Sequence, residues 1–337
     1  MVAIQISHSG RTVTELTEWA IPEAAQPKAS EFTFDLDRAL SSVVALRSEI
    51  PGDAFTAPIL GTERAGHGVL IRDDGLILTI GYLITEAEAI WLTAADGTAA
   101  PGHIVGYDQG SGFGLVQALG RFRVPALALG SSSSSKVGDS VIIAGEGGKA
   151  RALNAKVVSK REFAGYWEYL VDEALFTSPP HPNWGGAACI GQDGRLRGIG
   201  SLFVQEARAE GIASQGNMIV PIDLLPPILD DLLLYGRVNR PARPWLGMYI
   251  SDAEETVFVM GVADDGPAER DGVRPGDVIL QVGDTEVHDL PGMLRTVWSL
   301  GPAGADVPFT LLRDGKPMRL KVRSADRNDF LKKPRLH

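Results

Sequence analysis

The sequence predicts a mainly β protein, in which a barrel or sandwich of short strands is followed by a smaller domain of mixed β and α character. The 39 glycines and 21 prolines indicate many turns. At least seven short apolar stretches, separated by turn residues, lie between about residues 66 and 204. A polar, proline-rich stretch (GRVNRPARP, residues 236–244) then separates this region from a second one and is expected to be a linker. The length of 337 residues is enough for two or three domains.

The domains are predicted in order from these patterns. Residues 1–34 are mixed in composition and are expected to form an N-terminal arm, and the first folded domain is expected at 35–235. It should open with a short amphipathic helix, or a helix running into a strand, at residues 35–50. The stretch GVLIRDDGLILTIGYLI then predicts a strand, an Asp-Asp-Gly turn and a strand. A helix is expected at 221–235 with Pro221 in its first turn, a second domain at 245–324, and a tail at 325–337.

Charge and composition exclude several classes of protein. The formal net charge of −10 argues against nucleic acid as a partner, because phosphate binding needs a basic surface. Cys189 is the only cysteine, so there is no internal disulfide to indicate the compartment. No apolar stretch approaches 18 residues, which predicts no membrane span, and the N-terminus lacks a signal-peptide pattern. We expect a cytoplasmic protein, or a periplasmic one if a leader was trimmed, with no metal and no cofactor.

Several motifs in the first domain occur in a fixed order. Residues 66–71 (GHGVLI) precede 74–79 (DGLILT), and VGYD at 105–108 leads to GLV at 114–116. ALALGSS and VGD follow, and then PNWGG at 182–186 and DGRLRGI at 193–199. This series resembles the HtrA/DegP family of serine proteases over about residues 36–230. The resemblance implies a trypsin-like double β-barrel.

The catalytic positions that the resemblance implies are filled by unsuitable residues. In this family a serine nucleophile is activated by a histidine base, which a carboxylate orients. The base falls on Tyr82, the carboxylate on Gly112 and the nucleophile on Trp184. A phenol is a poor proton acceptor at neutral pH, glycine has no side chain, and an indole offers only an N–H donor. An oxyanion-hole donor falls on Pro182, which has no N–H, and losing one such donor costs about 10²–10³ in rate. The resemblance therefore predicts a degenerate triad.

Relocated catalytic residues are the alternative, and they would make the chain an active serine-type endopeptidase. His67 lies near the expected cleft, but a structural histidine is the favoured interpretation. Cys189, in the apolar stretch AACI, is favoured as a buried small residue. Ser178 and His181, in SPPHP, lack an orienting acid. Two interpretations of Trp184 also stay open, because its indole could plug the specificity pocket or simply pack on its loop.

The serine run at residues 131–135 has low complexity and predicts a flexible surface loop.

Residues 245–324 resemble a PDZ domain of the HtrA type. The motifs are PWLGM at 244–248, GPAERDGVRPGDVI at 266–279 and LLRDG at 311–315. A PDZ domain binds a peptide as an added strand, and the terminal carboxylate lies in a nest of backbone N–H groups. The strand is expected at 248–251 and the opposite wall on a helix at about 290–300. The predicted binding residues are Trp245, Leu246, Gly247, Met248, Tyr249, Ile250, Met293, Leu294 and Val297. For Trp245, a role as a core anchor is an equal alternative.

The sequence thus predicts a catalytically inactive HtrA-like protein that binds peptides or protein C-termini. It would act as an adaptor, scaffold or chaperone-like factor in bacterial protein quality control. The resemblance leaves open whether its partners include copies of itself, as in a trimer, or an active HtrA homologue.

Overall fold

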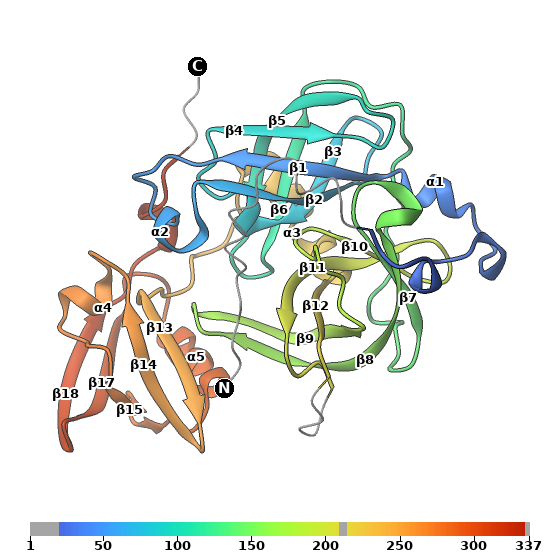
Figure 1. Ribbon diagram of the computed structural model, residues 1–337. Helices are drawn as coiled ribbons and strands as arrows, with labels where there is room; N and C mark the ends of the chain where they lie inside the picture. The colour runs from blue at the N-terminus through green and yellow to red at the C-terminus, as the bar shows by residue number, and fades with distance from the viewer. Residues whose placement is uncertain (1–19, 209–213, 334–337) are drawn as a thin grey trace. The chain divides into compact units, whose positions relative to one another are not determined.

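The computed structural model describes residues 20–208 and 214–333, and these form two compact units (Figure 1). The larger unit contains residues 20–161, 173–238 and 332–333. The smaller unit contains Asn239–Leu331 together with Glu162–Asp172, a segment from much earlier in the chain.

The first six strands close into a barrel in the order β1-β2-β3-β6-β5-β4. A one-turn helix, α1 (Leu36–Leu40), precedes it, so the predicted passage from helix to strand is confirmed. The turn predicted in the first hairpin is present at Gly75, whose φ of +93° suits glycine. The strands are β1 (Val43–Glu49), β2 (Glu63–Leu70), β3 (Leu76–Ile80), β4 (Ala89–Thr93), β5 (Ala99–Tyr107) and β6 (Phe113–Ala118).

The next six strands close into a second barrel in the order β10-β11-β12-β9-β8-β7. Its apolar centre includes Ile143, Val157 and Ile219. The strands are β7 (Ser140–Ala144), β8 (Ala152–Gly165), β9 (Tyr169–Ser178), β10 (Ala188–Ile190), β11 (Leu196–Val204) and β12 (Gly216–Pro221). The two closed barrels confirm the predicted double β-barrel.

The helix expected after the second barrel begins later than predicted. Pro221 ends strand β12, and α3 spans Pro226–Tyr235. The start at Pro226 has a physical reason, because a proline in the first turn gives up only an N–H that has no partner within the helix. Gly236, with a φ of +70°, ends the helix.

The smaller unit contains a sheet in the order β13-β14-β15-β17-β18, with β16 paired to β15. Helix α5 (Leu290–Ser299) lies against β13 and β15, and α4 (Pro267–Arg270) is a single turn. The strands are β13 (Met248–Ala253), β14 (Thr256–Val262), β15 (Val278–Val282), β16 (Thr285–Glu286), β17 (Asp306–Arg313) and β18 (Lys316–Arg323). This mixed unit is the predicted second domain.

Within the described residues, no helix is both long and apolar enough to cross a membrane.

Candidate functional site

Two loops of the first barrel bring the positions predicted for base and carboxylate together. Tyr82 lies in a short 3-10 turn, Gly81–Leu83, directly after β3. The N–H of Gly81 donates to the carbonyl of Gly112 at 2.7 Å, so the backbones at these two positions are adjacent. Gly112 itself has a φ of +82° and leaves no side chain to orient a base.

The phenol of Tyr82 already has a partner. Its O–H donates to the carbonyl oxygen of Ser201 at 2.8 Å. Burial raises the pKa of Tyr82 above its ordinary value, so the phenol keeps its proton. A Cβ placed on Gly185 would lie 2.9 Å from the phenol oxygen, which puts Tyr82 beside the residue that follows Trp184. Position 82, where the resemblance implies a base, therefore holds a hydrogen-bond donor beside the loop that contains Trp184.

Trp184 packs by its ring against strand β11. Its indole is half-buried, and its ring centroid lies 5.7 Å from that of Phe203. Its carbonyl accepts the N–H of Ala187 at 3.0 Å. Pro182, two residues earlier, is exposed and has no N–H to offer an oxyanion.

His67, the first candidate for a relocated base, is buried and neutral. The His67 ring accepts the N–H of Glu146 on Nδ1 at 3.1 Å. Its Nε2 is buried and has no hydrogen-bond partner in the part of the chain that the structure describes. Burial, aided by the charges of His181 and Arg151, lowers the pKa of His67 to about 3. Among the described residues, no serine or threonine hydroxyl and no cysteine thiol is hydrogen-bonded to either ring nitrogen of His67.

The other two candidates for relocated catalysis are also engaged or buried. His181 lies 2.9 Å from the carbonyl of Asn183 through Nδ1 and 2.9 Å from that of Arg151 through Nε2. The Ser178 hydroxyl instead donates to the carbonyl of Gln215 at 2.9 Å, so the structure does not join these two residues as a dyad. Cys189 is fully buried, and burial raises the pKa of its thiol to about 12. Since the thiolate is the nucleophile, this cysteine is poorly suited to catalysis.

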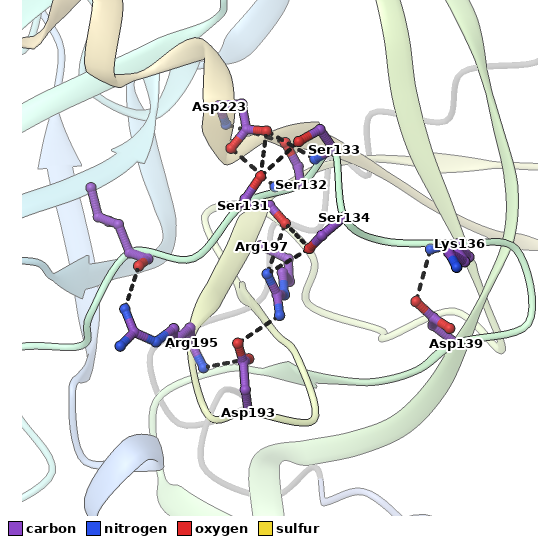
Figure 2. Close-up of polar contacts among 11 residues, drawn as sticks. Ser131, Ser132, Ser133, Ser134, Lys136, Asp139, Asp193, Arg195, Arg197 and Asp223 are labelled. Carbon is purple, nitrogen blue, oxygen red and sulfur yellow. Dashed lines mark hydrogen bonds and ion pairs between the residues drawn. The ribbon is translucent and has the colours of Figure 1, made fainter.

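The serine run is an organised turn around one carboxylate, as Figure 2 shows. Asp223 accepts the Ser131 hydroxyl at 2.9 Å, the Ser132 N–H at 3.0 Å and the Ser133 N–H at 2.8 Å. Arg197 of β11 donates to the Ser131 carbonyl at 2.7 Å from the other side. Composition alone does not reveal these partners, because Asp223 and Arg197 lie far along the chain.

In the smaller unit, the predicted nest is built from three consecutive N–H groups. Leu246, Gly247 and Met248 all donate to one carboxylate, that of Glu168. Gly247 has a φ of +74°, and its carbonyl accepts the N–H of Ala263 at 2.8 Å. This left-handed glycine turns successive N–H groups toward one point, as in other anion-binding nests.

Trp245 serves the core rather than the nest. Its backbone N–H donates to the carbonyl of Ala325 at 3.0 Å, and the N–H of Ala325 donates to the carbonyl of Trp245 at 2.9 Å. The buried indole packs on the ring of Phe330 with centroids 4.8 Å apart. Trp245 thus fixes the start of the nest without donating to the carboxylate.

Of the remaining predicted binding residues, Tyr249 and Ile250 lie on β13, and Met293, Leu294 and Val297 lie on α5. The N–H of Ile250 donates to the carbonyl of Tyr166, and the ring of Tyr249 lies beside that of Tyr166. Met293, Leu294 and Val297, predicted as binding residues, are 0% exposed and belong to the buried apolar cluster, so in this structure they are core residues rather than the lining of an open groove. Sequence reasoning missed Glu168, whose only signal was an acidic residue in the turn between β8 and β9.

Known proteins match both parts of the chain. The trypsin-like peptidase domain matches residues 66–199, and the PDZ domain matches residues 244–323. A probable periplasmic serine endoprotease DegP-like of Halomonas elongata is 26% identical over 281 residues, covering 79% of this chain and 57% of that protein. The serine protease Do-like HtrA of Bacillus subtilis is 23% identical over 330 residues, covering 88% and 72%. This chain thus combines a trypsin-like peptidase domain with a PDZ domain, and it is similar to HtrA/DegP-type proteins.

Solved structures of HtrA-type proteins share the fold of this HtrA-like chain. The HtrA-type protease AlgW with a decapeptide is 21% identical with a TM-score of 0.52, covering 89% of this chain and 98% of that one. A serine endoprotease from Yersinia pestis is 22% identical with a TM-score of 0.50, covering 87% and 98%. The HtrA-like chain spans little more than half the length of the Halomonas elongata relative, at 57%.

Proposed function

We propose that this HtrA-like chain is a catalytically inactive homologue that binds peptides or protein C-termini through its PDZ groove. The observation that carries the proposal is the nest, in which three successive N–H groups converge on a carboxylate oxygen within 3.1 Å. Such a nest needs no side-chain chemistry, and strand β13 beside it has one edge that is not paired with another strand of the sheet. The nest and this strand edge therefore suit an extended chain that ends in a carboxylate.

The loss of catalysis is argued from the other unit. Tyr82 keeps its proton and donates a hydrogen bond to the carbonyl of Ser201, Gly112 has no side chain, and the half-buried Trp184 indole has no nucleophilic atom. His67 and Cys189 are buried, and their pKa values favour the neutral imidazole and the neutral thiol at pH 7. Each argument is independent of the others, which supports a pseudoprotease.

Two measurements test this function. Unfolded casein and a fluorophosphonate probe should give neither turnover nor labelling, while an active HtrA-type protease serves as the positive control. Casein turnover that His67→Ala or Cys189→Ala abolishes would instead establish a relocated active site.

An array of peptides with free C-termini, each matched by its C-terminal amide, tests binding. We expect the acids to bind and the amides not to, because an amide places an N–H donor against the donors of the nest. Equal binding of acids and amides would contradict carboxylate recognition.

A further inference from the structure

The carboxylate in the PDZ nest comes from this chain itself. Glu168 lies in the turn between β8 and β9, within Glu162–Asp172, and this segment belongs to the same compact unit as the PDZ fold. Its Oε1 accepts the N–H groups of Gly247 at 2.7 Å, Met248 at 3.0 Å and Leu246 at 3.1 Å. Its Oε2 accepts Leu246 as well, at 3.0 Å. A peptide's terminal carboxylate needs these same donors.

The turn of the segment makes one backbone bond to β13 of the kind that an added strand makes. Strand β13 is at the end of the sheet, so one of its edges is not paired with another strand of the sheet. On this strand the N–H of Ile250 donates to the carbonyl of Tyr166 at 2.9 Å. Tyr166 precedes Glu168 by two residues, and Ile250 follows Met248 by two, which is the alternation of strand pairing. The rings of Tyr166 and Tyr249 lie 6.0 Å apart beside this bond.

An apolar side chain of the segment enters the PDZ core. Leu170 is 8% exposed and belongs to the cluster formed by Leu246, Met293, Leu294 and their neighbours. Burial of this leucine side chain favours the packed position of the segment. The segment thus supplies a carboxylate, a strand contact and an apolar anchor, which are the three elements of PDZ recognition.

Donor groups and positive charges of the PDZ fold face the acidic residues of the segment. Glu168 is 5% exposed, and burying a carboxylate is costly unless it is hydrogen-bonded. Burial raises the pKa of Glu168 to about 7, while the nest N–H groups and the charge of Arg327 act to lower it. On helix α5, Arg295 bonds to both Glu162 and Asp172, at the two ends of the segment.

Glu168 also has an unfavourable backbone. Its φ of +61° is in the left-handed region, which is unfavourable for a glutamate. Such a conformation persists where surrounding contacts determine it, and here those contacts are the nest bonds.

We propose that Glu162–Asp172 is an internal ligand of the PDZ groove, and that a peptide binds there by displacing Glu168. The proposal rests on the proposed peptide-binding function. It also defines the ligand class, which is an extended peptide with a free terminal carboxylate, an apolar last residue in the place of Leu170, and an aromatic residue two positions before it. An attached competitor acts at a high effective concentration, so it weakens the apparent affinity for every free peptide.

The test uses the full chain and a peptide copied from the segment. A fluorescein-labelled heptapeptide, Glu-Phe-Ala-Gly-Tyr-Trp-Leu, repeats residues 162–167 and ends in leucine with a free carboxylate. Its affinity is measured by fluorescence anisotropy for the wild type, Glu168→Gln and Glu173→Gln. Glu173 is the matched control, because it lies on β9 but pairs with Lys160 and not with the nest. We expect Glu168→Gln to bind the peptide about ten-fold or more tightly than the wild type, and Glu173→Gln to match the wild type.

Hydrogen exchange gives an independent reading without any peptide. In Glu168→Gln, and more strongly in Glu168→Ala, the amides of Leu246, Gly247, Met248 and Ile250 should exchange at least ten-fold faster. The amides of β17 and β18 should not change, which shows that the unit is folded.

Faster exchange of the nest amides in the Glu168 variants, with no peptide binding to any of the three proteins, would support the internal ligand and count against the proposed peptide function. Unchanged exchange with equal peptide affinity for all three proteins would overturn the internal ligand and leave the peptide function standing. Unchanged exchange and no binding would overturn both.

Discussion

The N–H of Gly247 donates to Oε1 of Glu168 at 2.7 Å, and it can do so because position 247 is a glycine. At a φ of +74°, a Cβ on this residue would lie 3.1 Å from the Trp245 ring and 3.3 Å from the Cβ of Ala263. Both neighbours are buried, so neither can move aside easily. The nest geometry thus depends on a backbone state that other residues enter at a cost.

Gly247→Ala should therefore destabilise the smaller unit by about 2 kcal/mol, measured by urea denaturation. About 1 kcal/mol comes from the left-handed backbone and the rest from the crowded Cβ. Gly315→Ala is the matched control, because Gly315 has a φ of +73° but no atom within 4 Å of its Cβ position. If Gly247→Ala and Gly315→Ala lower the free energy of unfolding equally, crowding of the added Cβ against Trp245 and Ala263 contributes nothing to the loss.

Asp277→Asn should also destabilise this unit, by about 2–3 kcal/mol. The Asp277 carboxylate is 1% exposed and accepts Nε and Nη2 of Arg313 at 2.6 and 2.7 Å, as well as the N–H of Arg274 at 2.8 Å. An asparagine turns an N–H group toward the guanidinium and leaves that charge without a counter-charge. Denaturant midpoints of the variant and the wild type measure the change.

The control for Asp277 is Asp306→Asn. Asp306 pairs with Lys321 and Arg323, but all three are well exposed, so the expected loss is below about 1 kcal/mol. Equal losses at positions 277 and 306 would mean that burial of the Asp277 pair does not matter.

The short apolar stretches between turn residues predicted a barrel or sandwich, and the resemblance to HtrA proteases predicted the double β-barrel and the nest. The stretch from Trp245 to Met248 is continuous in sequence, so the motif could name Leu246, Gly247 and Met248 as donors. The occupant of the nest could not be named, because Glu168 lies 79 residues before Gly247 and nothing in a lone acidic turn residue indicates a distant partner. Trp245 shows the same limit, since only the fold brings Ala325 to its N–H.

The catalytic positions illustrate what a motif can supply. The ordered series of motifs predicts that the catalytic positions fall on Tyr82, Gly112 and Trp184, and residue type alone predicts that they lack the usual groups. The motifs did not indicate that the Tyr82 phenol donates a hydrogen bond to the Ser201 carbonyl or that the Trp184 indole packs on Phe203, because these contacts join segments far apart in the sequence.

His67 should make the larger unit less stable in acid. Its pKa, about 3 in the folded protein, is far below the ordinary value of about 6.5, so the unfolded chain binds a proton first as the pH falls. Above pH 6.5 the ring is neutral in both the folded and the unfolded chain, so it does not lower the free energy of unfolding. As the pH falls from 6.5 toward 3, the unfolded chain is protonated and the folded one is not, so the free energy of unfolding decreases. Between pH 7 and pH 5 this single group should remove about 2 kcal/mol of unfolding free energy.

The pH effect is isolated by His67→Gln, which keeps an acceptor for the Glu146 N–H. Urea denaturation at pH 7 and pH 5 should show a smaller drop in stability for this variant, although His181 and Arg151 remain nearby. His103→Gln, at an exposed histidine, should behave as the wild type. An unchanged drop in His67→Gln would mean that the ring is protonated, or reached by solvent, in the folded protein.

Trp184→Ser should restore no measurable proteolysis. A hydroxyl at position 184 would still have no base, because the Tyr82 phenol donates to Ser201 and its pKa is raised by burial. Pro182 would still lack the N–H that an oxyanion needs, and the members of a catalytic triad act as a unit, so one of them alone gains little. Adding Tyr82→His would not complete the set, because Gly112 has a φ of +82° that strains any carboxylate residue placed there. Casein turnover and fluorophosphonate labelling of Trp184→Ser should equal those of the wild type, and labelling at position 184 would show that a base exists elsewhere in the cleft.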